Sequence, residues 1–171
     1  MRRPDVNGGL AADAHLVAEI LSAAEGAALS TGSPRIGPEH LLIGCLTTAD
    51  PSARAAVAAD GIDDRAVRAA LARVLDRAVL TGAAPAATSA SNDAADPDVL
   101  LAGSPPLAED GSEVLRRARV LSRMHRPRGL QSADVLVAVA ELEDGTARAV
   151  LDELSVDRQR LFDFRDWAAG R

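Results

Sequence analysis

The chain has 171 residues, of which 47% are apolar and 26% charged, and its 19 basic and 25 acidic residues leave a formal net charge of −6. This length suits one medium domain or two small ones, with room for a real core. Aromatic residues make up only 2%, so Ala, Leu, Val and Ile must build that core. Such small residues suit close-packed helices.

Every basic residue is arginine, because the sequence contains no lysine. This excludes a P-loop, a Schiff-base enzyme and a Ser-Lys hydrolase, each of which needs a lysine. The acidic pI of about 5.0 argues against nonspecific nucleic-acid binding, which needs excess positive charge. Cys45 is the single cysteine and cannot form an internal disulfide. Because the chain shows no signal segment and no apolar run of about 18 residues, we expect a cytoplasmic protein.

Residues 1–9 show no apolar periodicity and predict a flexible N-terminal tail. Residues 10–80 predict four helices, which are marked by apolar residues at steps of three and four and by Asp and Pro start signals. The predicted helix starts are Leu10, Gly37-Pro38, Asp50-Pro51 and Asp63. The second helix should run to about Thr47, and Gly61 should end the third.

Residues 81–106 are rich in Ala, Ser, Asp, Gly and Pro and predict a linker. Residues 107–171 then repeat the order of elements. A helical stripe restarts near Val114, and helix caps are expected at Ser132, Asp144 and Asp157. The helix that follows Ser132 should end at about Leu142.

The second half of the chain matches the first at an ungapped offset of 94 residues. The match runs from Glu19 to about Val67, and apolar residues such as Ile20 and Ile43 fall on Val114 and Val137. Identical pairs include Glu19 with Glu113, Leu42 with Leu136, Asp50 with Asp144, and Asp63 with Asp157. We therefore expect an all-α fold of about eight helices, arranged as two pseudo-symmetric four-helix repeats over residues 10–80 and 107–171.

The first repeat contains the segment Ile36-Gly37-Pro38-Glu39-His40-Leu41-Leu42-Ile43-Gly44-Cys45-Leu46. This segment resembles the Clp repeat in the N-terminal domain of Clp-type AAA+ unfoldases, especially ClpC, where Ile-Gly-x-Glu-His-Leu-Leu-x-Gly-Leu opens the second helix of each repeat. The second repeat keeps only the hydrophobic frame from Leu130 to Leu136. The resemblance covers about residues 10–168. It implies a free-standing all-α docking domain that binds adaptors and substrates and lacks the ATPase.

The same resemblance implies three ligand classes: adaptor proteins, unfolded or arginine-phosphorylated polypeptides, and cyclic peptide antibiotics. In ClpC-like domains the Glu of each Glu-His segment holds a guanidinium in a phosphoarginine site. Glu39 matches that position in the first repeat, whereas Ala133 stands there in the second, so at most one such site is expected. Leu10 and Leu107 stand where the antibiotic-binding face of the family carries Phe, which keeps an apolar surface but loses stacking area.

The residues with ionisable or reactive side chains also have simpler, structural interpretations. Glu39 stabilises a helix dipole by about 0.3 to 1 kcal/mol wherever it opens a helix. His40 is expected to cap that helix, since adjacent helical residues point about 100° apart and Glu39 and His40 do not easily share a metal. Cys45 is expected to be a buried small hydrophobe. No metal-ligand spacing, catalytic triad or nucleophile elbow is found, so we expect no enzyme, no metal and no cofactor.

The densest charge feature is a group of six arginines on and just after one predicted helix. They are Arg116, Arg117, Arg119, Arg123, Arg126 and Arg128. Arginine clusters bind phosphates or carboxylates. We favour the simpler interpretation, a solvated face offset by Glu109, Asp110 and Glu113, and DNA binding is the weaker rival.

The leading hypothesis is a monomeric, non-catalytic module that binds Clp adaptor or substrate proteins and modulates Clp proteolysis. The alternative is a protein that sequesters ClpC-targeting cyclic peptides, and the third is a DNA-binding regulator that uses the arginine-rich helix. No membrane partner is expected. The candidate binding residues are Glu39, His40, Leu10, Leu107, Arg116 and Arg117.

Overall fold

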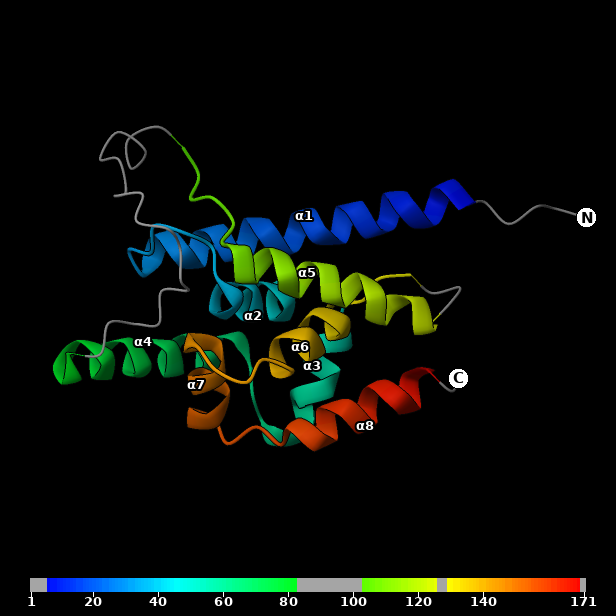
Figure 1. The fold of residues 1–171 in the computed structure, drawn as a ribbon. Coiled ribbons are helices and arrows are strands. Elements are labelled where there is room, and N and C mark those ends of the chain that lie inside the picture. The colour runs from blue at the N-terminus through cyan, green and yellow to red at the C-terminus, as the bar shows by residue number, and fades with distance from the viewer. Residues whose placement is uncertain (1–5, 83–102, 126–128, 170–171) are drawn as a thin grey trace, which may run out of the picture.

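The computed structural model describes residues 6–82, 103–125 and 129–169 (Figure 1). Within these residues the first half forms α1 (Val6–Ser30), α2 (Pro38–Thr47), α3 (Ser52–Val57), the 3-10 helix η1 (Ala58–Asp60) and α4 (Asp64–Thr81). The second half forms α5 (Glu109–Ser122), the 3-10 helix η3 (Arg123–His125), α6 (Ser132–Ala140), α7 (Thr146–Glu153) and α8 (Arg158–Ala169). The prediction of an all-α fold with eight α-helices is confirmed.

The helix boundaries reproduce the repeat that the sequence predicts. Each of the last three α-helices in one half begins 94 residues from its counterpart in the other half. The paired starts are Pro38 with Ser132, Ser52 with Thr146, and Asp64 with Arg158. The first helices differ in length, since α1 has 25 residues and α5 has 14.

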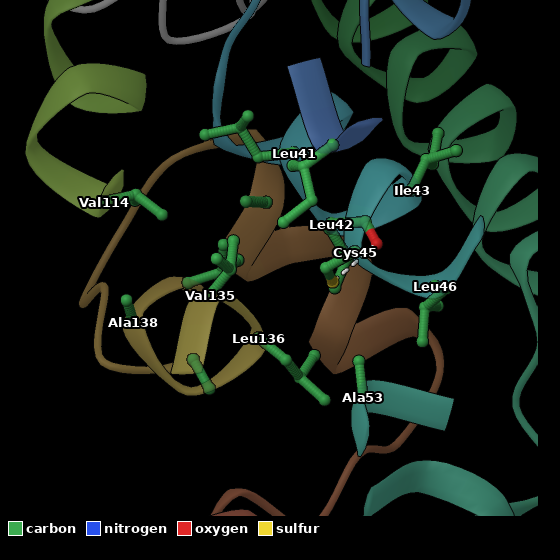
Figure 2. Close-up of a cluster of buried hydrophobic side chains, with 14 of the residues drawn as sticks. Leu41, Leu42, Ile43, Cys45, Leu46, Ala53, Val114, Val135, Leu136 and Ala138 are labelled. Carbon is green, nitrogen blue, oxygen red and sulfur yellow. Dashed lines mark hydrogen bonds between the residues drawn. The ribbon is translucent and has the colours of Figure 1, made fainter. Parts of the chain in front are cut away.

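Helices α2 and α6 form the centre of the molecule and pack against each other. In Figure 1, α1 and α5 lie on one side of this pair, and α3, α4, α7 and α8 lie on the other. All residues of α6 are buried, because contacts with α2, α3, α5 and α8 surround it. Figure 2 shows Leu42 and Cys45 of α2 lying opposite Val135 and Leu136 of α6.

The fourth helix of each half packs across the molecule onto the other half. Helix α4 packs on α7 as well as on α2 of its own half, and α8 packs on α3 as well as on α6 of its own half. Glu153 of α7 pairs with Arg73 of α4 at 2.9 Å and with Arg77 of α4 at 3.0 Å. Arg160 of α8 pairs with Asp60 at the end of η1. Residues from both halves therefore share one hydrophobic core.

Helix α1 approaches α2 closely at Gly44. A Cβ atom at this position would lie 2.5 Å from the Ile20 carbonyl oxygen. Only glycine leaves the backbone of α1 undisturbed at this distance. The matching position in α6 is Ala138, where the neighbouring helix leaves room for a methyl group.

Several predicted boundaries are confirmed. Helix α2 ends at Thr47, Asp63 accepts the Ala66 N–H at 2.7 Å as the cap of α4, and Asp157 accepts the Arg160 N–H at 3.2 Å at the start of α8. Helix α1 begins at Val6 rather than at Leu10, because a surface helix continues through glycines at a cost of only about 1 kcal/mol each. The tail prediction for residues 1–5 and the linker prediction for residues 83–102 lie outside the described residues.

Four other boundary predictions are wrong. The segment from Asp50 to Gly61 is not one helix, since α3 starts at Ser52 and η1 follows it. The caps of α6 and α7 are Gln131 and Gly145 rather than Ser132 and Asp144. Gly145 has a φ of 93°, which favours glycine. Helix α6 ends at Ala140 instead of Leu142, because the Arg158 guanidinium takes the carbonyls of both residues as hydrogen-bond acceptors.

Candidate docking site at the start of α2

Helix α2 starts with a tightly capped turn. Pro38 occupies its first position, where the missing N–H and fixed φ suit a helix start. The His40 ring folds back over this turn, and its Nδ1 accepts the Gly37 N–H at 3.0 Å. The predicted capping role of His40 is thereby confirmed.

Both ring nitrogens of His40 are engaged, and the residue is 1% exposed. Its Nε2 lies 3.2 Å from Thr31 Oγ1 just beyond the end of α1. Because Nδ1 accepts a hydrogen bond, Nε2 carries the proton and donates to the Thr31 hydroxyl. Burial lowers the pKa of His40 to about 4, although the negative charge of Asp110 opposes the shift. The imidazole is therefore neutral at neutral pH and forms part of the frame of the site.

Glu39 is the carboxylate of this corner, and its side chain is only 17% exposed. A Cβ atom on Gly37 would lie 2.6 Å from Oε1, so the carboxylate occupies the space that glycine leaves open. Burial raises the pKa of Glu39, the charge of Asp110 raises it further, and a hydrogen bond from the Glu39 backbone N–H opposes both. The His40 Nδ1 lies 3.3 Å from Oε1 but is neutral.

Among the residues that the structure describes, no arginine pairs with the Glu39 carboxylate. Within the described part of the chain, the only ion-pair-range neighbour of the carboxylate is the neutral ring of His40. Asp110 adds negative charge on the same side. A partly buried carboxylate in this setting favours a cation, and a planar guanidinium matches its two oxygens. No group of three metal-ligating side chains occurs among the residues described, so a metal ion has no built site there.

The matching corner in the second half has a different chemistry. Asp134 stands at the position of His40 and caps α6 in the same way, since its Oδ2 accepts the Gln131 N–H at 2.9 Å. Ala133 stands at the position of Glu39, so this corner has no equivalent carboxylate.

Hydrogen bonds from α3 close the α6 corner. Asp50 accepts the Ser132 N–H, Ser52 Oγ accepts the Ala133 N–H at 2.9 Å, and Ser132 Oγ accepts the Ala53 N–H at 3.1 Å. Burial acts to raise the pKa of Asp50, but hydrogen bonds from Ser132 and Ser52 outweigh it and hold the pKa below its usual value. The first N–H groups of α6 are thus taken by side chains of the other half.

The structure separates the two leucines expected on a ligand-binding face. Leu10 is 67% exposed near the start of α1. Leu107 is half-buried and forms an isolated parallel β-bridge with Ile36. Thr31, which contacts His40, lies 21 residues beyond Leu10 in sequence, so Leu10 lies about 30 Å from this corner along α1. Leu107 therefore belongs to the neighbourhood of Glu39, and Leu10 does not.

Arg116 and Arg117 both have carboxylate partners. Arg116 pairs with Glu113 one turn earlier on α5. Arg117 pairs with Glu141 at the end of α6 and ties the two helices together. Neither arginine contacts the Glu39 corner. Arg126 and Arg128 lie outside the described residues.

Cys45 is fully buried in α2. Burial raises the pKa of the Cys45 thiol to about 12, and Sγ donates to the Leu42 carbonyl at 3.1 Å. The prediction of a buried small hydrophobe is confirmed. In the part of the chain that the structure covers, no helix combines the length and apolarity that crossing a membrane requires.

Two parts of this site were not predicted as such. The sequence analysis gave Asp110 only the role of a charge that offsets nearby arginines. Asp110 lies 71 positions from Glu39 in the sequence, and nothing in the sequence indicates that the two are close in space. The Asp50, Ser52 and Ser132 cluster was not predicted, because the sequence indicates Asp50 and Ser132 as local helix starts and gives Ser52 no role. The offset of 94 contains a signal, since it places Ser132 on Pro38, which has no N–H to offer.

The fold and the site define an all-helical interaction domain of two pseudo-symmetric halves, with the Glu39 carboxylate at one corner and Ala133 at the matching corner of the other half. The family model of the Clp repeat (R) N-terminal domain matches residues 15–154, and the chain belongs to this family. The resemblance drawn from the Glu39-His40 segment is thereby confirmed. No curated protein matches the chain.

Proposed function

We propose that this chain is a docking module for Clp-type proteolysis in the cytoplasm, and that it binds adaptor proteins or substrate polypeptides without catalysing a reaction. Glu39 is the residue that recognises the ligand, and a guanidinium is the group it recognises. The observation that carries the proposal is the Glu39 carboxylate itself, which is largely buried beside Asp110 and has no arginine partner among the described residues.

Arginine-phosphorylated polypeptides are the ligand class that fits the family resemblance. The stoichiometry follows from the difference between the two corners. Ala133 offers no carboxylate, and Asp50 and Ser52 occupy the first N–H groups of α6. The chain should therefore bind one phosphoarginine group and not two.

Isothermal titration with a short phosphoarginine peptide tests this proposal. We expect one binding event per chain for the natural sequence. Glu39→Gln keeps the shape of the side chain but removes its charge, and should weaken binding at least about tenfold, because a hydrogen bond to a charged group contributes about 1.5 to 3 kcal/mol. Glu143→Gln is the matched control at an exposed position. Equal binding by the Glu39→Gln variant, or two equivalents per chain, would contradict the assignment.

Sequestration of cyclic peptides is the second candidate function. It draws support from Leu10, which is exposed on α1. Leu107 contributes little to the same surface, because it is half-buried and bridged to Ile36. A ClpC-targeting cyclic peptide at a hundred times its dissociation constant should stabilise the chain by about 2.7 kcal/mol, and Leu10→Ser should abolish the thermal shift. No shift with the natural sequence would reject this function.

A further inference from the structure

The outward side of α5 combines positive charge with exposed apolar side chains. Val114, Leu115, Ala118 and Leu121 face the core. The opposite side, which we name the α5 outer face, is exposed and continues into η3. Its basic and apolar members are Arg116, Arg119, Val120, Arg123 and Met124, and the exposed Glu109 and Glu113 lie on the same side nearer the start of the helix.

The two apolar members lie four residues apart and therefore on one stripe of the helix. Val120 is 43% exposed and Met124 is 65% exposed. Arg116 pairs with Glu113, whereas Arg119 and Arg123 have no carboxylate partner among the described residues. Cations near a helix C-terminus stabilise the dipole, but that effect does not require apolar neighbours. The combination of unmatched guanidinium groups and exposed apolar side chains indicates a contact surface.

The charge of this face selects the kind of partner. The whole chain carries a net charge of −6, which repels a polyanion such as nucleic acid, while a short acidic segment meets mainly the local arginines. Exposed Val120 and Met124 also offer nothing to a phosphate backbone. A second copy of the chain is the other candidate. Helix α5 has 14 residues and is about 20 Å long and about 10 Å wide, so a dimer would bury only about 200 Å² per partner there, against about 800 Å² in a stable interface.

We propose that the α5 outer face docks an acidic polypeptide segment that carries one or two apolar side chains. Carboxylates of the segment pair with Arg119 and Arg123, and its apolar side chains cover Val120 and Met124. The segment lies along α5, so a single helical turn or two of a partner protein is enough. This surface extends the interaction role proposed above and uses none of the residues around Glu39.

Fluorescence anisotropy with a labelled synthetic peptide tests the proposal. The probe has twelve residues, with glutamates that flank two leucines spaced four apart. Two control peptides replace the glutamates with glutamines or the leucines with serines. We expect the probe to bind more tightly than both controls. The paired change Arg119→Glu and Arg123→Glu should weaken binding about tenfold, since each exposed ion pair contributes about 0.2 to 1 kcal/mol and charge reversal adds repulsion.

The matched control changes the same net charge elsewhere. Arg65→Glu with Arg68→Glu alters two exposed arginines of α4 and should leave binding nearly unchanged. Arg119→Gln with Arg123→Gln should give an intermediate loss, and circular dichroism checks that each variant remains folded. If the control variant loses as much peptide binding as the α5 variant, the loss comes from the change in net charge and the proposal is overturned.

Other outcomes also overturn it. No binding of the acidic peptide, or tighter binding of a single-stranded oligonucleotide of equal length, would reject an acidic polypeptide as the occupant. If the chain forms a salt-sensitive dimer, and the paired change Arg119→Glu and Arg123→Glu converts that dimer to monomer, the face binds a second copy and the proposal is wrong. Glu39→Gln should leave peptide binding unchanged, so failure at α5 and failure of the phosphoarginine site are separate results.

Discussion

Replacement of Asp50 by alanine should loosen the contact between α3 and α6. The carboxylate accepts the N–H of Ser132, which is fully buried, as well as the N–H and hydroxyl of Ser52. Hydrogen bonds to a charged group contribute about 1.5 to 3 kcal/mol each, but Asp50 is half-buried and water replaces part of this contribution. We expect the free energy of unfolding to fall by about 2 kcal/mol, which lowers the melting temperature by about 4 to 8 °C.

The assay is thermal or urea unfolding followed by circular dichroism, with Asp144→Ala as the matched control. Asp144 is the counterpart of Asp50, yet it is exposed and makes no capping bond to α7, so its loss should change stability by less than about 0.5 kcal/mol.

The pH dependence of the Asp50→Ala effect follows from the lowered pKa of Asp50. Its stabilisation is complete above the pKa of the unfolded chain and is lost as the pH falls through the lower pKa of the folded state. The difference between natural and variant chains should therefore shrink in acid. Equal effects of the Asp50 and Asp144 changes, or a difference that grows in acid, would refute the reasoning.

Three further changes test the packing of α2. Gly44→Ala should destabilise the chain by about 1 to 3 kcal/mol in urea unfolding, since its Cβ would meet the Ile20 carbonyl at 2.5 Å, whereas Gly26→Ala on open helix surface should stabilise it slightly. The Cys45 thiol, whose pKa burial raises to about 12, should react with a disulfide reagent only after unfolding. Stability should fall as the pH drops from about 6.5 toward 4, because the unfolded chain binds a proton at His40 before the folded chain does, and His40→Asn should flatten that part of the profile.

The sequence was sufficient to predict the framework of the fold. Apolar periodicity and Pro and Asp start signals predicted the helices, and the offset of 94 predicted their pairing. These signals lie within one segment or recur in both halves, so they can be recognised in the sequence alone. The exact caps were harder, because Ser132 satisfies a donor on α3 instead of its own helix. The residues around Ser132 do not show whether its hydroxyl bonds to the nearby backbone of α6 or to a distant N–H such as that of Ala53.

The site was predictable only in part. The Glu39-His40 pair identified the corner, and the repeat showed that Ala133 breaks the symmetry. The sequence did not reveal that His40 is neutral and that both of its ring nitrogens form hydrogen bonds. Nor did it reveal that Asp110 adds negative charge near Glu39. Both depend on how α1 and α5 meet the start of α2. The family resemblance placed Leu10 and Leu107 on one ligand-binding face, but α1 extends well beyond the length of α5, and the chain entering α5 bridges to Ile36.

The crossing of α4 onto α7 and of α8 onto α3 has a consequence for the history of the chain. A gene for one half alone would make a product with an incomplete core, which a second molecule of the same product would complete through the same exchange. Duplication and fusion of such a gene turn an intertwined pair into a single polypeptide. Each corner can then change independently, so that one half carries the Glu39 carboxylate while the other, with Ala133, forms hydrogen bonds to α3.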